Sequence, residues 1–282
     1  MPLTRIQIAV LRLLASQRDP ESYVAGSTPL NRREARFSGD IDVFHDREER
    51  LAKAAIEDAE ILDSNGYRVQ WSRRDPSIYS AVVALGGETT KLEWVVDSDY
   101  RFFPAIRDEI FGYVLHPADP ATNKVSAAYG RRQPRDVVDL VSIHDRILPL
   151  GAAVWAAAGK AVGFTPEGII NEIRRVARYT EEDFRRVVCD PPIDPAATMR
   201  RLREILAEAE EFVLRMPTDK VGLLFLEGAK IVQPDPARLD SYRTHAGQRR
   251  GHWPAGPEVA VAMLERAAAM FGAVDSPPAA DR

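Results

Sequence analysis

The spacing of apolar residues changes near residue 118, and this change constrains the fold more than any other feature of the sequence. Upstream, short runs with alternating apolar residues are interleaved with helical stretches. Downstream, apolar residues recur at three- and four-residue spacing. The change predicts an α/β N-terminal core with a mixed sheet over residues 1–117, a mostly helical C-terminal domain over 118–274, and a disordered polar tail over 275–282.

The N-terminal core is expected to begin with a helix over residues 3–14. A capping pair, Asp46 and Glu49, is expected to open a second helix that stops at Asn65 and Gly66. Glycines 86 and 87 indicate a hairpin between two of the strands. The predicted strands cover residues 22–25, 38–44, 67–71, 78–85, 89–96 and 113–115.

Prolines mark the predicted starts of helices in the C-terminal half, because a missing N–H costs nothing in the first helical turn. The longest helix is expected over 195–216, and a hairpin over 221–232. The apolar run 147–164 contains Pro149, three glycines and Lys160, so a buried helix is favoured over a membrane span. The prolines concerned are Pro120, Pro134, Pro166, Pro195 and Pro257, and Thr165, Thr180 and Asp194 are the predicted N-caps.

Composition excludes several classes of protein. The 282 residues are 45% hydrophobic and 28% charged, which excludes a collagen or a disordered chain. A single cysteine, Cys189, allows no internal disulfide and fits a reducing compartment. The net charge of −4 excludes a protein that binds nucleic acid over its whole surface, although residues 119–203 carry a basic excess. We therefore expect a cytoplasmic monomer without membrane contact.

Two carboxylates on one strand carry the most informative chemistry. Asp40 and Asp42 alternate with Ile41 and Val43, so both acids point to the same face. Like charges this close repel each other, and a divalent cation relieves the repulsion, with Mg²⁺ as the first candidate and Mn²⁺ as the alternative. An isolated Asp-x-Asp is more often a solvated strand edge, which is the alternative interpretation.

Two further signals favour the metal site. Upstream of Asp40, and separated from it by twelve residues, is the pair Gly26-Ser27: Gly26 allows close backbone approach and the Ser27 hydroxyl can bind a phosphate. On the run 91–95, Glu93 is the natural third carboxylate. Such a set suits in-line phosphoryl transfer, in which metals neutralise a triphosphate and a carboxylate orients or deprotonates the attacking hydroxyl.

A second group of charges follows in the helical half. Lys124, Ala127, Ala128 and Arg131 share one helix face, and Pro134 then starts a helix that carries acids and an arginine in its first turns. Lys124, Arg131 and Arg135 are candidates to bind a triphosphate. The alternative is that Arg135, Asp136 and Asp139 are surface charges, since acids are favoured at helix starts.

Together these residues resemble the AbiEii/AbiGii-type nucleotidyltransferase family, which includes the mycobacterial MenT toxins. The resemblance covers about residues 20–146. It implies a polymerase-β-like core, Mg²⁺, a nucleoside triphosphate donor, and transfer to the acceptor end of tRNA. The resemblance also implies roles: Asp40 and Asp42 would hold metal, Gly26 and Ser27 phosphate, and Lys124 the triphosphate, while Asp136 would orient Lys124 or Arg131.

One segment departs from this family. Residues 29–37 are polar and basic where relatives often have a more apolar helix, which places Arg32, Arg33 and Arg36 near a possible substrate path. Further arginines occur in clusters at 73–74, 174–178, 185–186, 200–203 and 249–250. These are expected to be solvated helix faces unless several converge beside the aspartates, where they would track an RNA backbone.

The sequence thus favours a metal-dependent nucleotidyltransferase that acts on RNA, with the tRNA 3′ end as first candidate acceptor. It would be the toxin of a toxin–antitoxin or phage-defence system, use a triphosphate such as ATP or CTP, and have an antitoxin as a candidate partner. Alternatives are transfer to a protein hydroxyl or a small molecule, a DxD glycosyltransferase with Mn²⁺, and a non-catalytic binding module.

Overall fold

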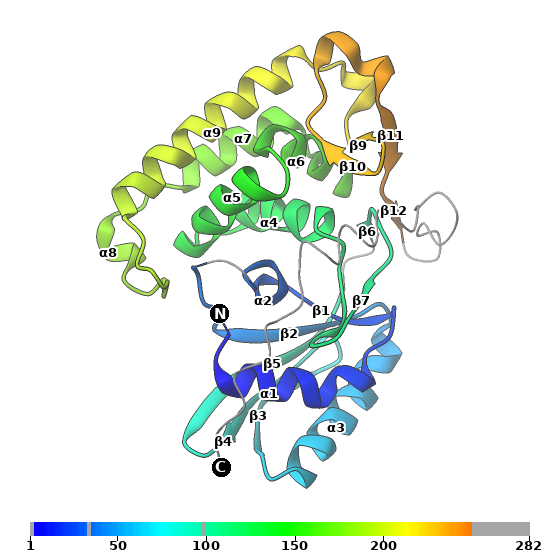
Figure 1. Ribbon diagram of the computed structural model, residues 1–282, viewed down its shortest axis with the longest axis vertical. Helices are drawn as coiled ribbons and strands as arrows, with labels where there is room; N and C mark the ends of the chain where they lie inside the picture. Colours follow the sequence, from blue (N-terminus) through cyan, green and yellow to red (C-terminus); the bar gives the residue numbers. More distant parts are fainter. Residues whose placement is uncertain (1–2, 33–34, 98–99, 250–282) are drawn as a thin grey trace.

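A computed structural model describes residues 3–32, 35–97 and 100–249 of the chain. A sheet-bearing part forms the lower half of the molecule in Figure 1, and a mostly helical part lies above it. This arrangement confirms the predicted fold class of an α/β core followed by helices. The division into two domains at residue 117 stays a prediction, and the predicted tail and the helix start at Pro257 lie outside the described residues.

The core of the lower half is a seven-stranded mixed sheet in the order β3-β4-β5-β2-β1-β8-β7. Two pairings, β2 with β5 and β1 with β8, are parallel, and the others are antiparallel. The strands are β1 (Ser22–Ala25), β2 (Asp40–His45), β3 (Arg68–Asp75), β4 (Ile78–Leu85), β5 (Glu88–Val96), β7 (Ile106–Asp108) and β8 (Gly112–Val114). All six predicted strands are present, whereas β7 was not predicted.

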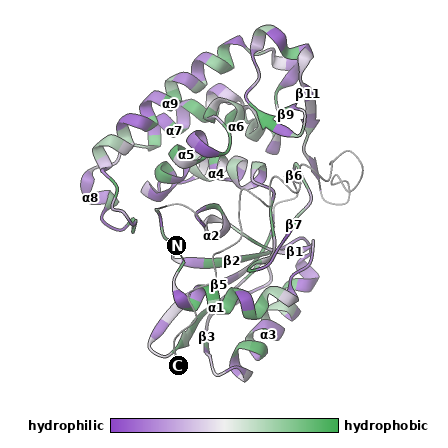
Figure 2. Ribbon diagram, viewed as in Figure 1, coloured by the Kyte–Doolittle hydropathy of each residue, from purple (hydrophilic) through white to green (hydrophobic). Residues whose placement is uncertain are grey.

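Helices α1 (Arg5–Leu14) and α3 (Glu48–Ser64) cover one face of this sheet. Burial along β2 alternates as the sequence predicts, and Ile41 and Val43 pack into the core beneath the two helices. Asp40 and Asp42 consequently face the other side, toward the helical part. Bands of opposite hydropathy along α3 and α9 in Figure 2 show the same division between buried and solvated faces.

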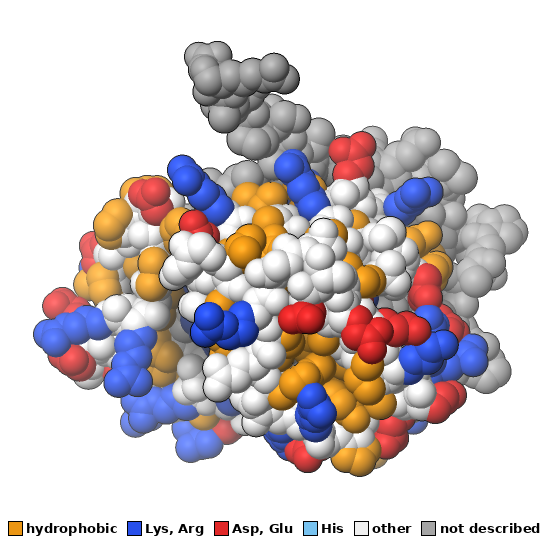
Figure 3. Space-filling view, turned by 90° about the horizontal axis from the view of Figure 1, so that it is seen from below, with side chains coloured by type: hydrophobic (Ala, Val, Ile, Leu, Met, Phe, Trp, Pro, Cys, Tyr) orange, Lys and Arg blue, Asp and Glu red, His pale blue; other side chains and the backbone are white. Residues whose placement is uncertain are grey.

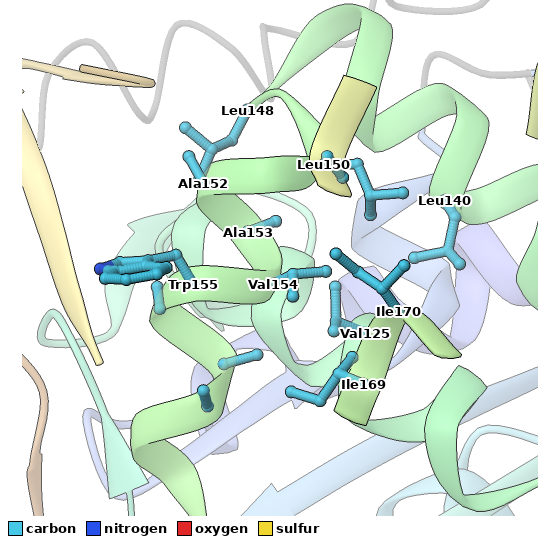
Figure 4. Close-up of a cluster of buried hydrophobic side chains, with 14 of the residues drawn as sticks. Val125, Leu140, Leu148, Leu150, Ala152, Ala153, Val154, Trp155, Ile169 and Ile170 are labelled. Carbon is cyan, nitrogen blue, oxygen red and sulfur yellow. The ribbon is translucent and has the colours of Figure 1, made fainter. Parts of the chain in front are cut away.

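The upper half is built around α6, whose eight residues are all buried. Figure 4 shows Val154 and Leu150 of α6 pointing toward Ile169 and Ile170 of α7, with Trp155 on the opposite side of α6. The predicted buried helix in 147–164 is thus confirmed. The helices are α2 (Ser27–Leu30), α4 (Ala118–Gly130), α5 (Pro134–Arg146), α6 (Leu150–Ala157), α7 (Pro166–Val176), α8 (Glu181–Phe184) and α9 (Pro195–Arg215), with 3₁₀ turns at Ala15–Gln17, Ala158–Lys160, Thr218–Lys220 and Pro236–Ser241.

Two small sheets complete the structure. The predicted hairpin is present as β9 (Leu223–Glu227) and β10 (Lys230–Val232), and β11 (Arg243–Ala246) extends it on the other edge of β9. Beyond β11, β12 (Gln248–Arg249) pairs with β6 (Tyr100–Arg101). The chain therefore returns from the upper half to β6, which lies in the sequence between β5 and β7 of the large sheet.

The predicted capping pair at the start of α3 is wrong. The N-cap is Arg47, which makes no side-chain capping bond. Asp46 instead accepts hydrogen bonds from Tyr23 and from Arg101, and its side chain is buried. A charged guanidinium offers a carboxylate a stronger hydrogen bond than a backbone N–H does, and the fold brings Arg101 to it from 55 residues away.

Within the described residues, no helix is both long and apolar enough to span a lipid bilayer. Figure 3 shows the molecule from below, and acidic and basic side chains are interspersed on that face. This face therefore does not carry a continuous basic surface that could bind phosphates. This distribution agrees with the charge argument made from the sequence.

Beneath the sheet, a buried ion pair joins Arg18 to Asp58 of α3, and Trp94 of β5 donates to the same carboxylate at 2.7 Å. Asp58→Ala leaves the guanidinium buried without its partner, so we expect a loss of about 3–5 kcal/mol in the free energy of unfolding. Asp63→Ala, at an exposed position on α3, should change it by about 0.5 kcal/mol or less. Urea denaturation measures both, and equal losses would contradict the role given to the ion pair.

Candidate active site

A cleft of about 600 Å³ separates the open face of the sheet from α4. It lies where β1 leads into α2 and where the strand β2 turns its acids away from the core. Eight of the predicted site residues line it: Gly26, Ser27, Asp40, Asp42, Glu93, Lys124, Arg131 and Arg135. Asp136, the ninth, is buried behind the cleft wall.

The three predicted carboxylates come together in the cleft. Parallel pairing of β2 with β5 sets Asp42 beside Glu93, and oxygens of Asp40, Asp42 and Glu93 lie within 4.8 Å of one another. Burial, followed by the charges of Asp40 and Glu93, raises the pKa of Asp42 to about 7. Lys91, at 2.7 Å from Glu93, offsets part of this repulsion. Such a cluster of hard oxygen ligands fits Mg²⁺ or Mn²⁺.

The turn before α2 requires glycine. Gly26 has φ of +70°, and a Cβ at this position would collide with the carboxylate of Asp42. The missing side chain therefore lets the chain cross directly over the aspartate. It also places the Ser27 hydroxyl at the cleft wall, because Ser27 directly follows the glycine that lies against Asp42.

Lys124 of α4 reaches across to this turn. Its Nζ lies 2.7 Å from Ser27 Oγ, 2.7 Å from Asp139 Oδ2 and 3.5 Å from Asp136 Oδ1. Only 6% of Lys124 is exposed, so the ammonium is held in one place at the edge of the cleft. The lysine and the Gly-Ser turn, both predicted to bind phosphate, are therefore in direct contact in the structure.

Asp139 was not included among the site residues, yet it organises this corner. Besides Lys124, it accepts hydrogen bonds from Asn31 at 3.2 Å and from both Arg36 Nε and Nη2, at 2.6 and 3.0 Å. Burial alone would raise its pKa, but the charges of Lys124 and Arg36 lower the pKa to about 2. The interpretation of Asp139 as a surface charge is wrong, because its carboxylate is completely buried.

Arg131 and Arg135 differ in their surroundings. Arg131 forms two hydrogen bonds of 2.8 Å to Asp136, which fixes its guanidinium at the cleft wall and matches the orienting role suggested for Asp136. Arg135 also lines the cleft, and its Nε is buried without a hydrogen-bond partner among the described residues. Arg135 is thus a cation at the cleft wall that no described carboxylate pairs with by an ion pair.

The expectation that Arg32 and Arg36 lie on a substrate path is wrong. Both are buried, Arg32 in an ion pair with Asp108 and Arg36 with Asp139. Arg33 lies outside the described residues. Among the arginine clusters, Arg73, Arg174, Arg175, Arg185 and Arg201 pair with surface acids, as the solvated-face interpretation predicts, and Arg249 alone of the clusters' described members lines the cleft.

Several lining residues carried no recognisable sequence signal. These are Tyr100, Asn123, Lys160 and Phe164, which line the cleft together with Arg249 and come from different elements or loops. Their convergence depends on β12 pairing with β6 and on the turn after α6. Neither contact follows from local spacing.

Asp139→Asn keeps the side chain's shape but removes the charge between Lys124 and Arg36. We expect a loss of about 3–5 kcal/mol in the free energy of unfolding, because Arg36 loses its carboxylate partner and Lys124 keeps only the 3.5 Å contact with Asp136. Asp145→Asn, which breaks a surface ion pair on the same helix, should cost about 1 kcal/mol or less. Urea denaturation at neutral pH compares the two, and a similar cost for both would refute this account.

In the unmodified protein, the stabilisation from Asp139 is present above the ordinary pKa of 3.8, because the folded-state value is depressed. It is lost as the pH falls from 3.8 toward 2. The Asp139→Asn variant should therefore lack this part of the acid transition.

No protein-family model matches the sequence, and no match is found among curated proteins. Among solved structures, MenT4, a nucleotidyltransferase toxin from Mycobacterium tuberculosis, matches 76% of this chain and 83% of its own, with 20% identity and a TM-score of 0.55. A proposed nucleotidyltransferase from H. pylori (73% and 92% covered, 15% identity, TM-score 0.44) and the Cid1 poly(U) polymerase (77% and 91%, 11%, 0.28) are too distant to support a conclusion. The chain has the fold of a nucleotidyltransferase toxin, as its motifs implied.

Proposed function

We propose that this chain is a metal-dependent nucleotidyltransferase that transfers a nucleoside monophosphate from a triphosphate to RNA. The observation that carries the proposal is the convergence of Asp40, Asp42 and Glu93 opposite Ser27 and Lys124 in one cleft. Carboxylates and phosphate-binding donors a few ångströms apart are what phosphoryl transfer requires. The tRNA 3′ end is the first candidate acceptor, and the biological role is that of a toxin.

The reaction forms one bond and breaks one. The acceptor hydroxyl oxygen attacks the α-phosphorus, the bond from that phosphorus to the bridging oxygen breaks, and pyrophosphate leaves. The hydroxyl proton passes to a carboxylate of the triad or to water. Mg²⁺ or Mn²⁺, when bound by Asp40 and Asp42, supplies the positive charge that offsets the phosphate oxygens and the carboxylates.

The chain's own residues bind the triphosphate, position the binding groups and accept the proton. Ser27 and Lys124 are placed to bind the β- and γ-phosphates, with Arg131 and Arg135 as further donors. Asp139 and Asp136 touch no substrate in this scheme and act as positioning residues for Lys124 and Arg131. Glu93 lies at the β5 side of the metal ligands, where it can bind a second cation or accept the proton.

The acceptor and the partner are proposed from the similarity to MenT4 and from the chemistry of the site. MenT4 is described as a toxin, which supports a toxin role here and makes an antitoxin a candidate partner. A glycosyltransferase site would use the two aspartates but would leave the Ser27–Lys124–Asp139 arrangement without a purpose. Transfer to a protein hydroxyl or a small molecule uses the same chemistry, so the labelled product must identify the acceptor.

Incubation with each α-³²P-labelled triphosphate, Mg²⁺ or Mn²⁺ and total cellular RNA should label RNA, and sequencing of RNA 3′ ends identifies the acceptor. Asp42→Asn should reduce the rate by about 10²-fold or more, because it removes a metal ligand. Glu60→Gln, an exposed acid on α3, should leave the rate unchanged. Absence of label from RNA with all four triphosphates would refute an RNA acceptor, and label in protein or small molecules would select the alternatives.

Gly26→Ala tests the turn independently of the carboxylates. The added methyl group meets Asp42 and the positive φ costs about 1–2 kcal/mol, so we expect the transfer rate to fall about 10-fold or more. Gly39→Ala provides a matched control just before β2, because a Cβ there meets no atom within 4 Å and φ is not positive. Equal rates for the two variants would show that the turn does not position the site.

A further inference from the structure

Lys160 is a buried cation that forms no direct ion pair with a described carboxylate, although the charges of Asp119 and Asp97 act on it. Its Nζ donates to Asn123 Oδ1 at 2.8 Å and lies 3.5 Å from the Tyr100 carbonyl oxygen, and no described carboxylate pairs with it. Its ammonium sits 5.3 Å from the centre of the Tyr100 ring and 5.6 Å from that of Phe102. An ammonium held in this way loses hydration, and burial accordingly lowers the pKa of Lys160 below its ordinary value.

The lysine faces the active cleft from the end opposite to Arg131. It is bonded to Asn123 in the first half of α4, whereas Arg131 caps the end of that helix, about 12 Å further along the axis. The carboxylate triad and Ser27 line the same cleft. The cleft therefore combines cations at two separate places along α4 with acids from the sheet.

The surroundings of Lys160 are rigid. Gly247, next to β12, passes so close to the Tyr100 ring that a Cβ would overlap it, and β12 pairs with the strand that carries Tyr100. Arg249 of β12 lines the same end of the cleft, as does the ring of Phe164. Asp97, the acid at this end among the described residues, accepts a hydrogen bond from the Tyr23 hydroxyl. This end offers two cations and aromatic surface to a ligand.

In-line transfer decides which substrate belongs at this end. The attacking oxygen and the leaving pyrophosphate lie on opposite sides of the α-phosphorus. With the pyrophosphate bound by Ser27 and Lys124 and extending toward Arg131 and Arg135, the attacking hydroxyl is assigned to the Lys160 end, about 12 Å from Arg131 along α4. An acceptor RNA strand brings with that hydroxyl a phosphodiester and bases, which suit cations and aromatic rings.

We infer that Lys160, with Arg249 and the ring of Tyr100, forms an acceptor subsite that binds the last phosphodiester of the RNA strand. The inference rests on the proposed function, since it assigns the second substrate of that reaction. Lys160 acts here as a binding residue for the acceptor. The triphosphate is bound by the opposite end of the cleft.

Binding is measured separately from transfer. Fluorescence anisotropy with a labelled single-stranded RNA that has a free 3′-hydroxyl gives the RNA dissociation constant without triphosphate. Titration of triphosphate with Mg²⁺ gives the donor dissociation constant without RNA. Lys160→Gln should weaken RNA binding about 10-fold, as expected for one charge-assisted hydrogen bond, and leave triphosphate binding within about 2-fold.

Matched variants separate this site from general effects of charge. Arg135→Gln should show the reverse pattern, with weaker triphosphate binding and RNA binding within about 2-fold. Lys53→Gln, which removes an exposed charge on α3, should change neither constant. Lys160→Arg should restore RNA binding, since it keeps the charge, and the KM for RNA should rise with Lys160→Gln more than kcat falls.

The outcomes are distinct. Wild-type protein that neither binds RNA nor labels it would refute the proposed function, and with it the subsite. Labelling of RNA together with unchanged RNA affinity in Lys160→Gln would overturn the subsite alone, and weakened triphosphate binding would assign Lys160 to the donor. If Lys160→Gln fails to fold, Arg249→Gln, at an exposed position, replaces it with the same expectations.

Discussion

The buried ion pair between Lys124 and Asp139 is the constraint on which the cleft depends. It joins α4 to α5, and through Ser27 and Asn31 it fixes both helices to the turn that follows β1. Arg36, on the loop before β2, forms an ion pair with the same carboxylate. Because a buried charge without a partner is costly, these elements must stay in register with one another. The sheet and the helical wall are thus held apart at a fixed distance, with the aspartates between them.

Acidic and basic side chains occupy separate places inside the cleft. The net charge of the chain does not reveal this separation. Three carboxylates cluster on β2 and β5, and their mutual repulsion is reflected in the raised pKa of Asp42. Cations line the same cleft, among them Lys124, Arg135 and Lys160. Two anionic substrates can therefore meet at a centre that is itself anionic until a cation binds. A net charge of −4 is compatible with such a site because its acids are part of the chemistry.

Sequence reasoning succeeded where the signal is local. Alternation along residues 40–44 predicted which side chains face the core, and the three- and four-residue spacing from Lys124 placed Arg131 on the same wall. It failed where a distant partner decides. Asp46 fits a helix cap by sequence, but Arg101 engages it, and Asp139 fits a solvated helix start although Lys124 and Arg36 enclose it. Lys160 sits in an apolar run, and only the turn after α6 brings it to the cleft.

The two halves of the structure contribute different things to the site. The strands β1, β2 and β5 supply the carboxylates and the phosphate turn, whose geometry follows from sheet register and from one positive φ angle. The helical half supplies the side chains that face the substrates from above, at positions set by tertiary contacts. A shift in register by one residue would turn Asp40 and Asp42 into the core, whereas the helical side chains depend on contacts such as the Lys124–Asp139 ion pair. The site therefore needs both the sheet register and the packing of α4 and α5 to be kept.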